Sequence, residues 1–96
     1  MYTVRWVASA LNDLAELWIN SDSSQRRAIV SATSEIDRLL CTAPQNQGES
    51  RATNQRIMFA APLGLVFDIR EDEKTVRVLG IWRIDKARGD RQSEQS

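Results

Sequence analysis

The segment that decides the fold spans residues 56–84 and reads RIMFAAPLGLVFDIREDEKTVRVLGIWRI. Apolar and polar side chains alternate with a period of two in three runs of it, at 56–60, 65–70 and 75–84. Such alternation predicts β-strands, and the Pro-Leu-Gly and Glu-Asp-Glu triplets between the runs predict tight turns. Three strands joined by tight turns form an antiparallel meander.

The alternation also assigns the faces of the last two strands. Leu65, Phe67 and Ile69 share the face of the middle strand that we expect in the core. In the last strand the alternation separates two sets: Val76, Val78, Gly80 and Trp82 on one face, and Arg77, Leu79, Ile81 and Arg83 on the other. This mixed polarity predicts a central strand whose two faces are both mostly covered.

The first half of the chain predicts one strand and two helices. In residues 2–7, bulky apolar side chains alternate with Thr3 and Arg5, which predicts a short strand that can join an edge of the sheet. Ser9 is placed to cap a helix whose apolar positions, through Trp18, recur at three and four residues.

A second helix follows the polar break at 20–24. Asp22 and Gln25 resemble a capping box at its start, and Pro44 cannot continue it, so we expect it to end by Thr42. The short connection predicts an antiparallel helical hairpin packed on one face of the sheet. The element order is then β-α-α-β-β-β, an α+β fold.

The length of 96 residues favours one domain, which we place at residues 1–86. Residues 44–54 contain almost no apolar side chain and predict a surface loop. Residues 87–96 have Ala87 alone as an apolar residue and predict a flexible C-terminal tail.

The composition excludes several functional classes. Thirteen basic and thirteen acidic residues cancel, so the chain has no general attraction to nucleic acid or anionic lipid. No stretch approaches the roughly 20 apolar residues of a membrane span, and no secretory leader pattern opens the sequence. The single cysteine, Cys41, forms no intrachain disulfide and suits a reducing compartment, so we expect a cytoplasmic protein.

The order of elements and several short motifs resemble the RelE/ParE superfamily of toxin–antitoxin toxins from about Tyr2 to Lys86. The motifs are Tyr2-Thr3-Val4-Arg5-Trp6, Ala10 with Asn12-Asp13-Leu14, Ile36-Asp37 with Leu39, Pro44 and Gly48, Arg56, Pro62-Leu63-Gly64-Leu65-Val66-Phe67-Asp68-Ile69, and Val76 with Val78-Leu79, Ile81 and Arg83. Each motif is mainly a strand or helix pattern, and their joint order carries the resemblance.

The resemblance implies a toxin of a type II, plasmid-stabilisation pair, neutralised by a cognate antitoxin whose segment wraps the sheet edge and the helical hairpin. Family members that cut messenger RNA on the ribosome use Arg and Lys with a Tyr or His. Here Gly64 stands at a strand position where those members carry an Arg, and Arg83 stands where a His is common. The chain has no His, so a general base near neutral pH is missing.

Three cations are the candidate catalytic residues: Arg56, Arg83 and Lys86. If they meet on one face of the sheet, they would hold a phosphate and stabilise the charge that develops during phosphodiester cleavage. The alternative interpretation is that they are ordinary surface cations.

The remaining chemically active residue types favour structural roles. Trp6 and Trp18 lie on apolar stripes, so we expect both in the core, whereas Trp82 beside Arg83 is a candidate for base stacking. A catalytic Cys41 would need a base such as His, so we expect an inert thiol. Nothing in the sequence predicts a cofactor or a metal site.

Three functional hypotheses follow. The missing His and Arg favour a ParE-like toxin that acts on DNA gyrase over a RelE-like endoribonuclease that acts on ribosome-bound messenger RNA. A third hypothesis is a binding domain derived from this fold, which forms a homodimer or holds a small partner. The neutral charge and the absent base fit that third hypothesis as well.

Overall fold

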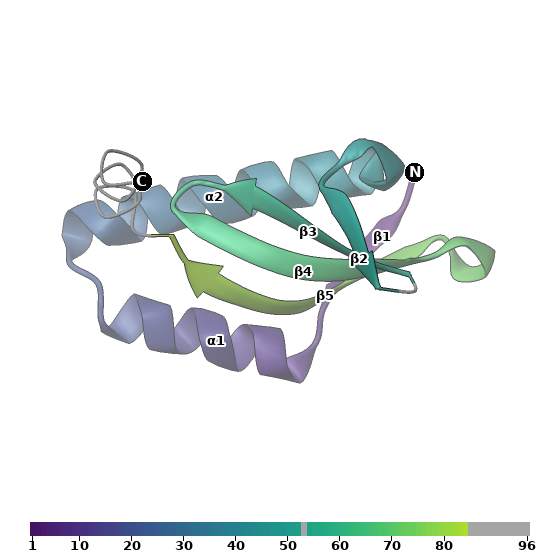
Figure 1. Ribbon diagram of the computed structural model, residues 1–96. Helices are drawn as coiled ribbons and strands as arrows, with labels where there is room; N and C mark the ends of the chain where they lie inside the picture. The colour runs from purple at the N-terminus through teal and green to yellow at the C-terminus, as the bar shows by residue number, and fades with distance from the viewer. Residues whose placement is uncertain (53, 85–96) are drawn as a thin grey trace, which may run out of the picture.

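The computed structural model describes residues 1–52 and 54–84, which form one α+β unit of two helices and a five-stranded sheet (Figure 1). The elements are β1 (Thr3–Trp6), α1 (Ala8–Ile19), α2 (Ser23–Thr42), the 3-10 turn η1 (Pro44–Asn46), β2 (Glu49–Ala52), β3 (Gln55–Ala60), β4 (Leu63–Arg70), the 3-10 turn η2 (Glu71–Glu73) and β5 (Thr75–Arg83). The tail predicted at 87–96 and the end of the predicted domain lie outside the described residues. In the part described, neither helix is long and apolar enough to cross a membrane.

The sheet has the strand order β1-β5-β4-β3-β2. Strands β3, β4 and β5 form the predicted antiparallel meander, and their bounds agree with the predicted runs within two residues. The opening strand joins the sheet edge as predicted, but it pairs with β5 in parallel, with Thr3 opposite Thr75 and Trp6 opposite Val78. The sheet is therefore mixed, because the path through α1 and α2 brings β1 and β5 together in the same direction.

The structure contains a strand, β2, that the sequence pattern did not predict, because residues 44–54 were expected to form a loop. It pairs antiparallel with the start of β3, Glu49 opposite Ile57, after a turn in which Gly48 has a φ of +70°. The segment carries no bulky apolar side chain. An edge strand tolerates such a polar composition. Hydrophobic alternation therefore gave no signal for it.

A β-bulge in β5 corrects the face assignment of the last strand. Val66 pairs with Gly80 and Phe67 with Val78, so Leu79 is the extra residue. The bulge reverses the alternation beyond it, and Ile81 is buried with Val78. Gly80 and Trp82 consequently lie on the opposite face from Val78, contrary to the prediction.

Helix α2 covers one face of the sheet, and the core fills the space between them (Figure 1). Its buried residues Ile29, Ala32, Ile36 and Leu40 recur at helical spacing, facing buried side chains of the three central strands: Met58, Leu63, Leu65, Phe67, Val76, Val78 and Ile81. The predicted capping box is confirmed, since Asp22 Oδ1 accepts from Gln25 N–H and Gln25 Oε1 accepts from Asp22 N–H, both at 2.8 Å.

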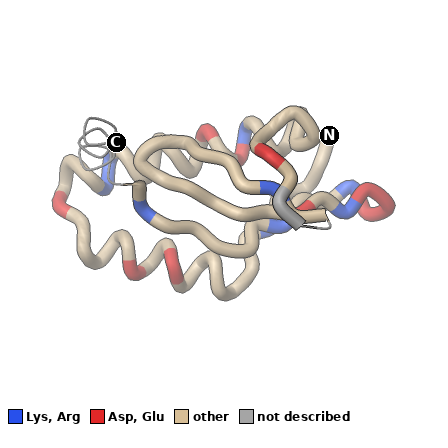
Figure 2. The backbone as a smooth tube through the Cα atoms, in the orientation of Figure 1, with Lys and Arg blue, Asp and Glu red and all other residues tan. Residues whose placement is uncertain are grey.

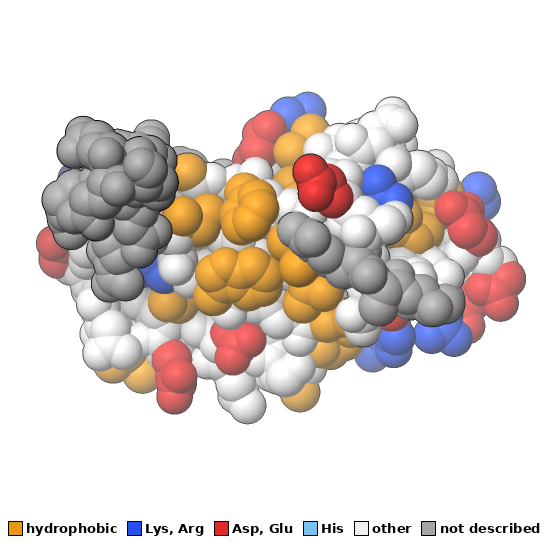
Figure 3. All heavy atoms as spheres, viewed as in Figure 1, with side chains coloured by type: hydrophobic (Ala, Val, Ile, Leu, Met, Phe, Trp, Pro, Cys, Tyr) orange, Lys and Arg blue, Asp and Glu red, His pale blue; other side chains and the backbone are white. Residues whose placement is uncertain are grey.

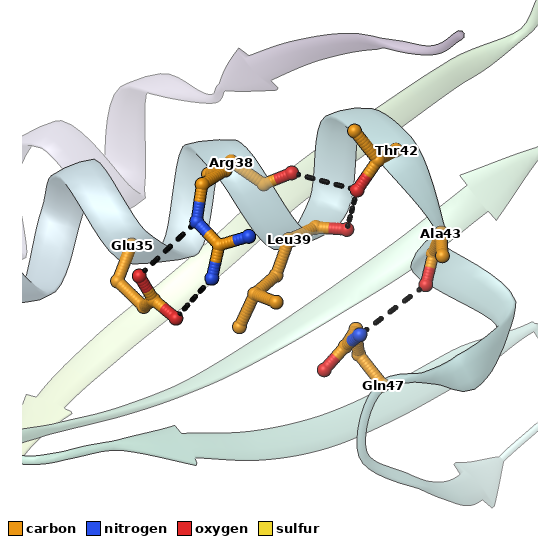
Figure 4. Close-up of polar contacts among 6 residues, drawn as sticks. All are labelled: Glu35, Arg38, Leu39, Thr42, Ala43 and Gln47. Carbon is orange, nitrogen blue, oxygen red and sulfur yellow. Dashed lines mark hydrogen bonds and ion pairs between the residues drawn. The ribbon is translucent and has the colours of Figure 1, made fainter.

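The end of α2 is held by side chains that satisfy its last carbonyl groups (Figure 4). The Thr42 hydroxyl donates to the Arg38 carbonyl at 3.0 Å, and Gln47 Nε2 donates to the Ala43 carbonyl at 3.4 Å. Glu35 and Arg38 form an ion pair along the exposed side of the same turn. The helix ends at Thr42, as predicted.

Helix α1 closes the edge of β5 that β1 leaves open. Strand β1 pairs only with residues 75–78, and beyond that point two α1 side chains bond the β5 backbone. Ser9 Oγ donates to the Leu79 carbonyl at 2.9 Å, and Asp13 Oδ2 accepts from Ile81 N–H at 3.2 Å. Ser9 is therefore not the helix cap that the sequence predicts, since Val7 occupies that position and the Ser9 hydroxyl is used by the sheet.

Candidate functional site

The face of the sheet opposite α2, here called the outer face, carries an exposed apolar surface. Ladder pairing places Phe59, Gly64 and Trp82 in one row and Ile57, Val66 and Gly80 in the next. Apolar side chains gather at the centre of this face in Figure 3. Phe59 is 62% exposed and Trp82 is 39% exposed, which is high for large aromatic side chains.

The aromatic pair is arranged by the glycine between its members. Phe59 and Trp82 lie edge to face, with ring centroids 6.5 Å apart and an interplanar angle of 80°. The Trp82 indole reaches over β4 at Gly64, where an added Cβ would lie 2.6 Å from Trp82 Nε1. Only a residue without a side chain leaves the indole in this position.

The other end of the outer face is basic. Arg5, Arg77 and Asp68 occupy one row across β1, β5 and β4, and Arg70 follows in the next row. Figure 2 shows several basic positions near the end of the sheet at which η2 lies, beside the acidic positions of η2. Arg77 donates two hydrogen bonds, of 3.0 and 2.5 Å, to the carboxylate of the buried Asp68, and this interaction raises the pKa of Arg77.

A second apolar surface, here called the helical groove, lies between the two helices. It is a groove of 380 Å³ lined by Leu11, Leu14, Ala15, Trp18, Ile19, Ile29, Val30 and Thr33. The prediction that Trp18 lies in the core is wrong, since the side chain is 38% exposed. It lies at the groove, where Arg26 Cζ is 5.1 Å from its ring centroid. Trp6 is half-buried, and its Nε1 donates to Asp37 at 3.0 Å.

The predicted catalytic cations are held by different elements. Arg56 donates to the carbonyl groups of Gln47 and Gly48, at 2.8 and 3.2 Å, and so fastens the turn before β2. Arg83, at the far end of the sheet, donates to Ser21 Oγ at 3.4 Å. Lys86 lies outside the described residues, so the catalytic role of the three remains a prediction.

Tyr2, the only tyrosine, is part of a polar cluster at the start of β1. Its hydroxyl donates to Glu71 Oε1 at 2.7 Å, and Gln45 Nε2 donates both to the Tyr2 hydroxyl and to Glu71 Oε2. The hydrogen bond from Tyr2, with that from Gln45, lowers the pKa of Glu71. Among the described residues, no three Cys, Asp or Glu side chains are grouped as metal ligands would be.

Solved structures with the same arrangement of strands and helices identify the architecture. A chain of the RelBE2 toxin–antitoxin complex from Mycobacterium tuberculosis matches with a TM-score of 0.67 and 20% identity, over 85% of this chain and 90% of that one. The RelE/ParE fold is the fold of this chain. A chain of the chromosomal ParDE system of P. aeruginosa matches it with a TM-score of 0.66 and 20% identity, over 88% of this chain and 98% of that one.

The isolated RelE toxin of E. coli extends the comparison to the whole chain. It matches with a TM-score of 0.61 and 11% identity, over 100% of both chains. No protein-family model and no curated protein matches the sequence. The RelE/ParE fold is therefore established by three-dimensional similarity, as the sequence motifs predict.

The outer face was not found from the sequence, although one signal was present. The strict alternation assigns Trp82 to the face of Val78, and the bulge at Leu79 reverses it. A glycine inside a strand, as at Gly80, is typical of a bulge and is the signal that would have placed Trp82 correctly.

Proposed function

We propose that this chain is a cytoplasmic toxin of a type II toxin–antitoxin pair, that it is ParE-like, and that it acts by binding DNA gyrase rather than by cutting RNA. The RelE/ParE fold is compatible with either target, because solved structures of this fold include both ParDE and RelBE proteins. The proposal therefore depends on the chemistry of the outer face.

The observation that carries the proposal is the position of Trp82 over Gly64. The ribonuclease members resembled by this sequence carry an Arg at the strand position of Gly64. Here even a Cβ would lie 2.6 Å from the indole nitrogen, so a long cationic side chain would displace Trp82. An apolar surface stands where phosphate chemistry would need a cation, and apolar aromatic surfaces are typical of protein binding.

The residues available to act as a general base also favour protein binding over RNA cleavage. The chain has no His, and the Tyr2 hydroxyl is engaged by Glu71 and Gln45. A guanidinium group cannot serve as a general base in a protein, so arginine does not take the place of the missing His. Of the Tyr and His that the resembled ribonucleases use with their cations, this chain thus has no His, and its one Tyr is already hydrogen-bonded.

The helical groove is the surface that suits the antitoxin. It is apolar and lies between two helices, and an amphipathic helix can lay its apolar face in a groove of this kind. Ile19 is 72% exposed and Val30 is 51% exposed on its walls, so a partner would remove substantial apolar area from water. Ile19→Ser should therefore weaken binding of the antitoxin by at least about tenfold.

Expression of the chain in bacteria, with and without the product of its neighbouring short reading frame, tests the proposal. We expect growth arrest by the chain alone, rescue by the partner, and inhibition of gyrase supercoiling by the purified protein. Cleavage of messenger RNA in a translation extract, lost in Arg83→Ala, would establish the ribonuclease alternative instead. Harmless expression together with a stable homodimer would favour the binding-domain alternative.

A further inference from the structure

The outer face combines apolar surface at one end with an excess of cations over anions in its strand rows at the other. We propose that it binds a segment of the toxin's protein target in which apolar side chains contact Phe59 and Trp82 and a carboxylate contacts Arg5. This inference rests on the proposed function and adds to it the place and the chemistry of target recognition.

The basic end of the face has three cations, Arg5, Arg70 and Arg77, and one carboxylate in the same rows, that of Asp68, while Glu73 of the adjoining η2 also acts on Arg77. Arg5 lies directly opposite Arg77 in the β1–β5 ladder, and like charges at opposed positions repel. Asp68 uses both carboxylate oxygens for Arg77 and so compensates only one of the two cations. Arg5 and Arg70 have no ion pair or side-chain hydrogen bond within the part of the chain that the structure describes. A carboxylate from outside the chain would relieve this repulsion.

The apolar end of the outer face favours a protein ligand over a nucleic acid strand. A polyanion needs cations along its whole path, but the surface of Ile57, Phe59, Val66 and Trp82 carries none. Asp13 lies on its border, with Oδ2 3.5 Å from the position of a Cβ at Gly80, and acidic side chains line this border in Figure 3. The net charge of zero gives no long-range attraction to nucleic acid either.

The spacing of the two ends defines the ligand further. The row of Gly64 and the row of Asp68 are four residues apart along β4, which corresponds to roughly 14 Å of strand. Because Arg5 lies on β1, to one side of both Trp82 and Phe59, the target segment should present its carboxylate at least about this distance from its apolar side chains.

The outer face is distinct from the proposed antitoxin site. Residues of α1 and α2 alone line the helical groove, whereas strand residues alone make up the apolar and basic parts of the outer face. The two surfaces can consequently be changed independently. Antitoxin binding then serves as a measure of folding for variants of the outer face.

The test uses the full chain with Phe59→Ser and with the double change Arg5→Glu and Arg70→Glu. Growth arrest and inhibition of gyrase supercoiling measure target recognition, and affinity for the product of the neighbouring reading frame measures the fold. Phe59→Leu keeps an apolar side chain at the same place. Arg27→Glu changes the charge of an exposed cation on α2 that is not part of the outer face, although it lies beside Trp18 and Val30 of the helical groove.

We expect both changes to the outer face to lower gyrase inhibition at least tenfold and to abolish growth arrest, with antitoxin affinity changed less than twofold. Phe59→Leu and Arg27→Glu should keep growth arrest. Full toxicity of Phe59→Ser would overturn the inference while leaving the proposed function intact, and so would loss of antitoxin binding in the same variant. A wild-type chain that does not arrest growth would instead refute the proposed function and this inference with it.

Discussion

Asp13 Oδ2 accepts a hydrogen bond from the backbone N–H of Ile81 at 3.2 Å, across 68 positions of the sequence. This contact replaces a missing strand, because β1 ends beside Val78 and leaves the rest of β5 without a ladder partner on that side. Ser9 does the same for the Leu79 carbonyl at 2.9 Å. The start of α1 is thereby fixed to the strand that presents Trp82.

The first prediction concerns this contact. Asp13→Ala leaves the half-buried N–H of Ile81 without its acceptor, and we expect a loss of about 1–3 kcal/mol in the free energy of unfolding. Asp13→Asn keeps an acceptor oxygen and should lose less. Denaturant unfolding followed by circular dichroism measures both. Equal stability of Asp13→Ala and the wild type would show that water replaces the carboxylate.

The sequence predicted the features that depend on local order and missed those that depend on distant pairing. Strands β3 to β5 and the end of α2 followed from alternation, turn residues and Pro44. The motif Asn12-Asp13-Leu14 marked a helix, but nothing in the sequence identified Ile81 as a partner of Asp13. Long-range contacts of this kind form only when the topology is complete.

The candidate site shows the same limit. Arg5 and Arg77 become neighbours only through the parallel pairing of β1 with β5, which alternation within each strand does not specify. Trp82 reaches the outer face only because of the bulge at Leu79. Arg56 and Arg83, predicted with Lys86 as catalytic candidates, donate hydrogen bonds to Gln47 and to Ser21, partners that no pattern in the sequence identifies.

The second prediction tests the core between α2 and the sheet. Leu40 is fully buried beneath the last turns of α2, so Leu40→Ala should remove about 2–5 kcal/mol of stability through lost burial and a cavity. Val30→Ala, on the exposed side of the same helix, should change stability by less than about 0.5 kcal/mol. Thermal unfolding of the two variants provides the comparison, and similar melting temperatures would contradict the assigned orientation of α2.

The third prediction concerns pH. Hydrogen bonds from Tyr2 and Gln45 lower the pKa of Glu71 in the folded state. A depressed carboxyl pKa stabilises the fold above the unfolded-state value, about 4.3 for Glu, and this stabilisation is lost as the pH falls through the lower folded-state pKa. Tyr2→Phe removes the main donor, so its stability should decrease less than that of the wild type between about pH 6 and about pH 3.

Urea unfolding at a series of pH values measures this difference. Glu71→Gln, which has no titrating carboxyl, should show the same reduced dependence as Tyr2→Phe. Parallel pH profiles for the wild type and both variants would mean that Glu71 does not couple to folding. The exposed Glu35, whose carboxylate pairs with Arg38 on the outside of α2, provides a control position through Glu35→Gln.

The fourth prediction compares two glycines of the outer face, which differ in the atoms that an added Cβ would meet. An added Cβ at Gly64 would meet Trp82 Nε1 at 2.6 Å, whereas at Gly80 the nearest atoms would lie 3.5 and 3.7 Å away, in ordinary contact. Gly64→Ala should therefore displace the indole, shift the tryptophan fluorescence to longer wavelength and cost about 1–3 kcal/mol. Gly80→Ala should keep the emission spectrum and change stability by less than about 1 kcal/mol. If both variants behaved alike, Trp82 would not lie over Gly64 in solution, and the protein-binding character assigned to this face would lose its basis.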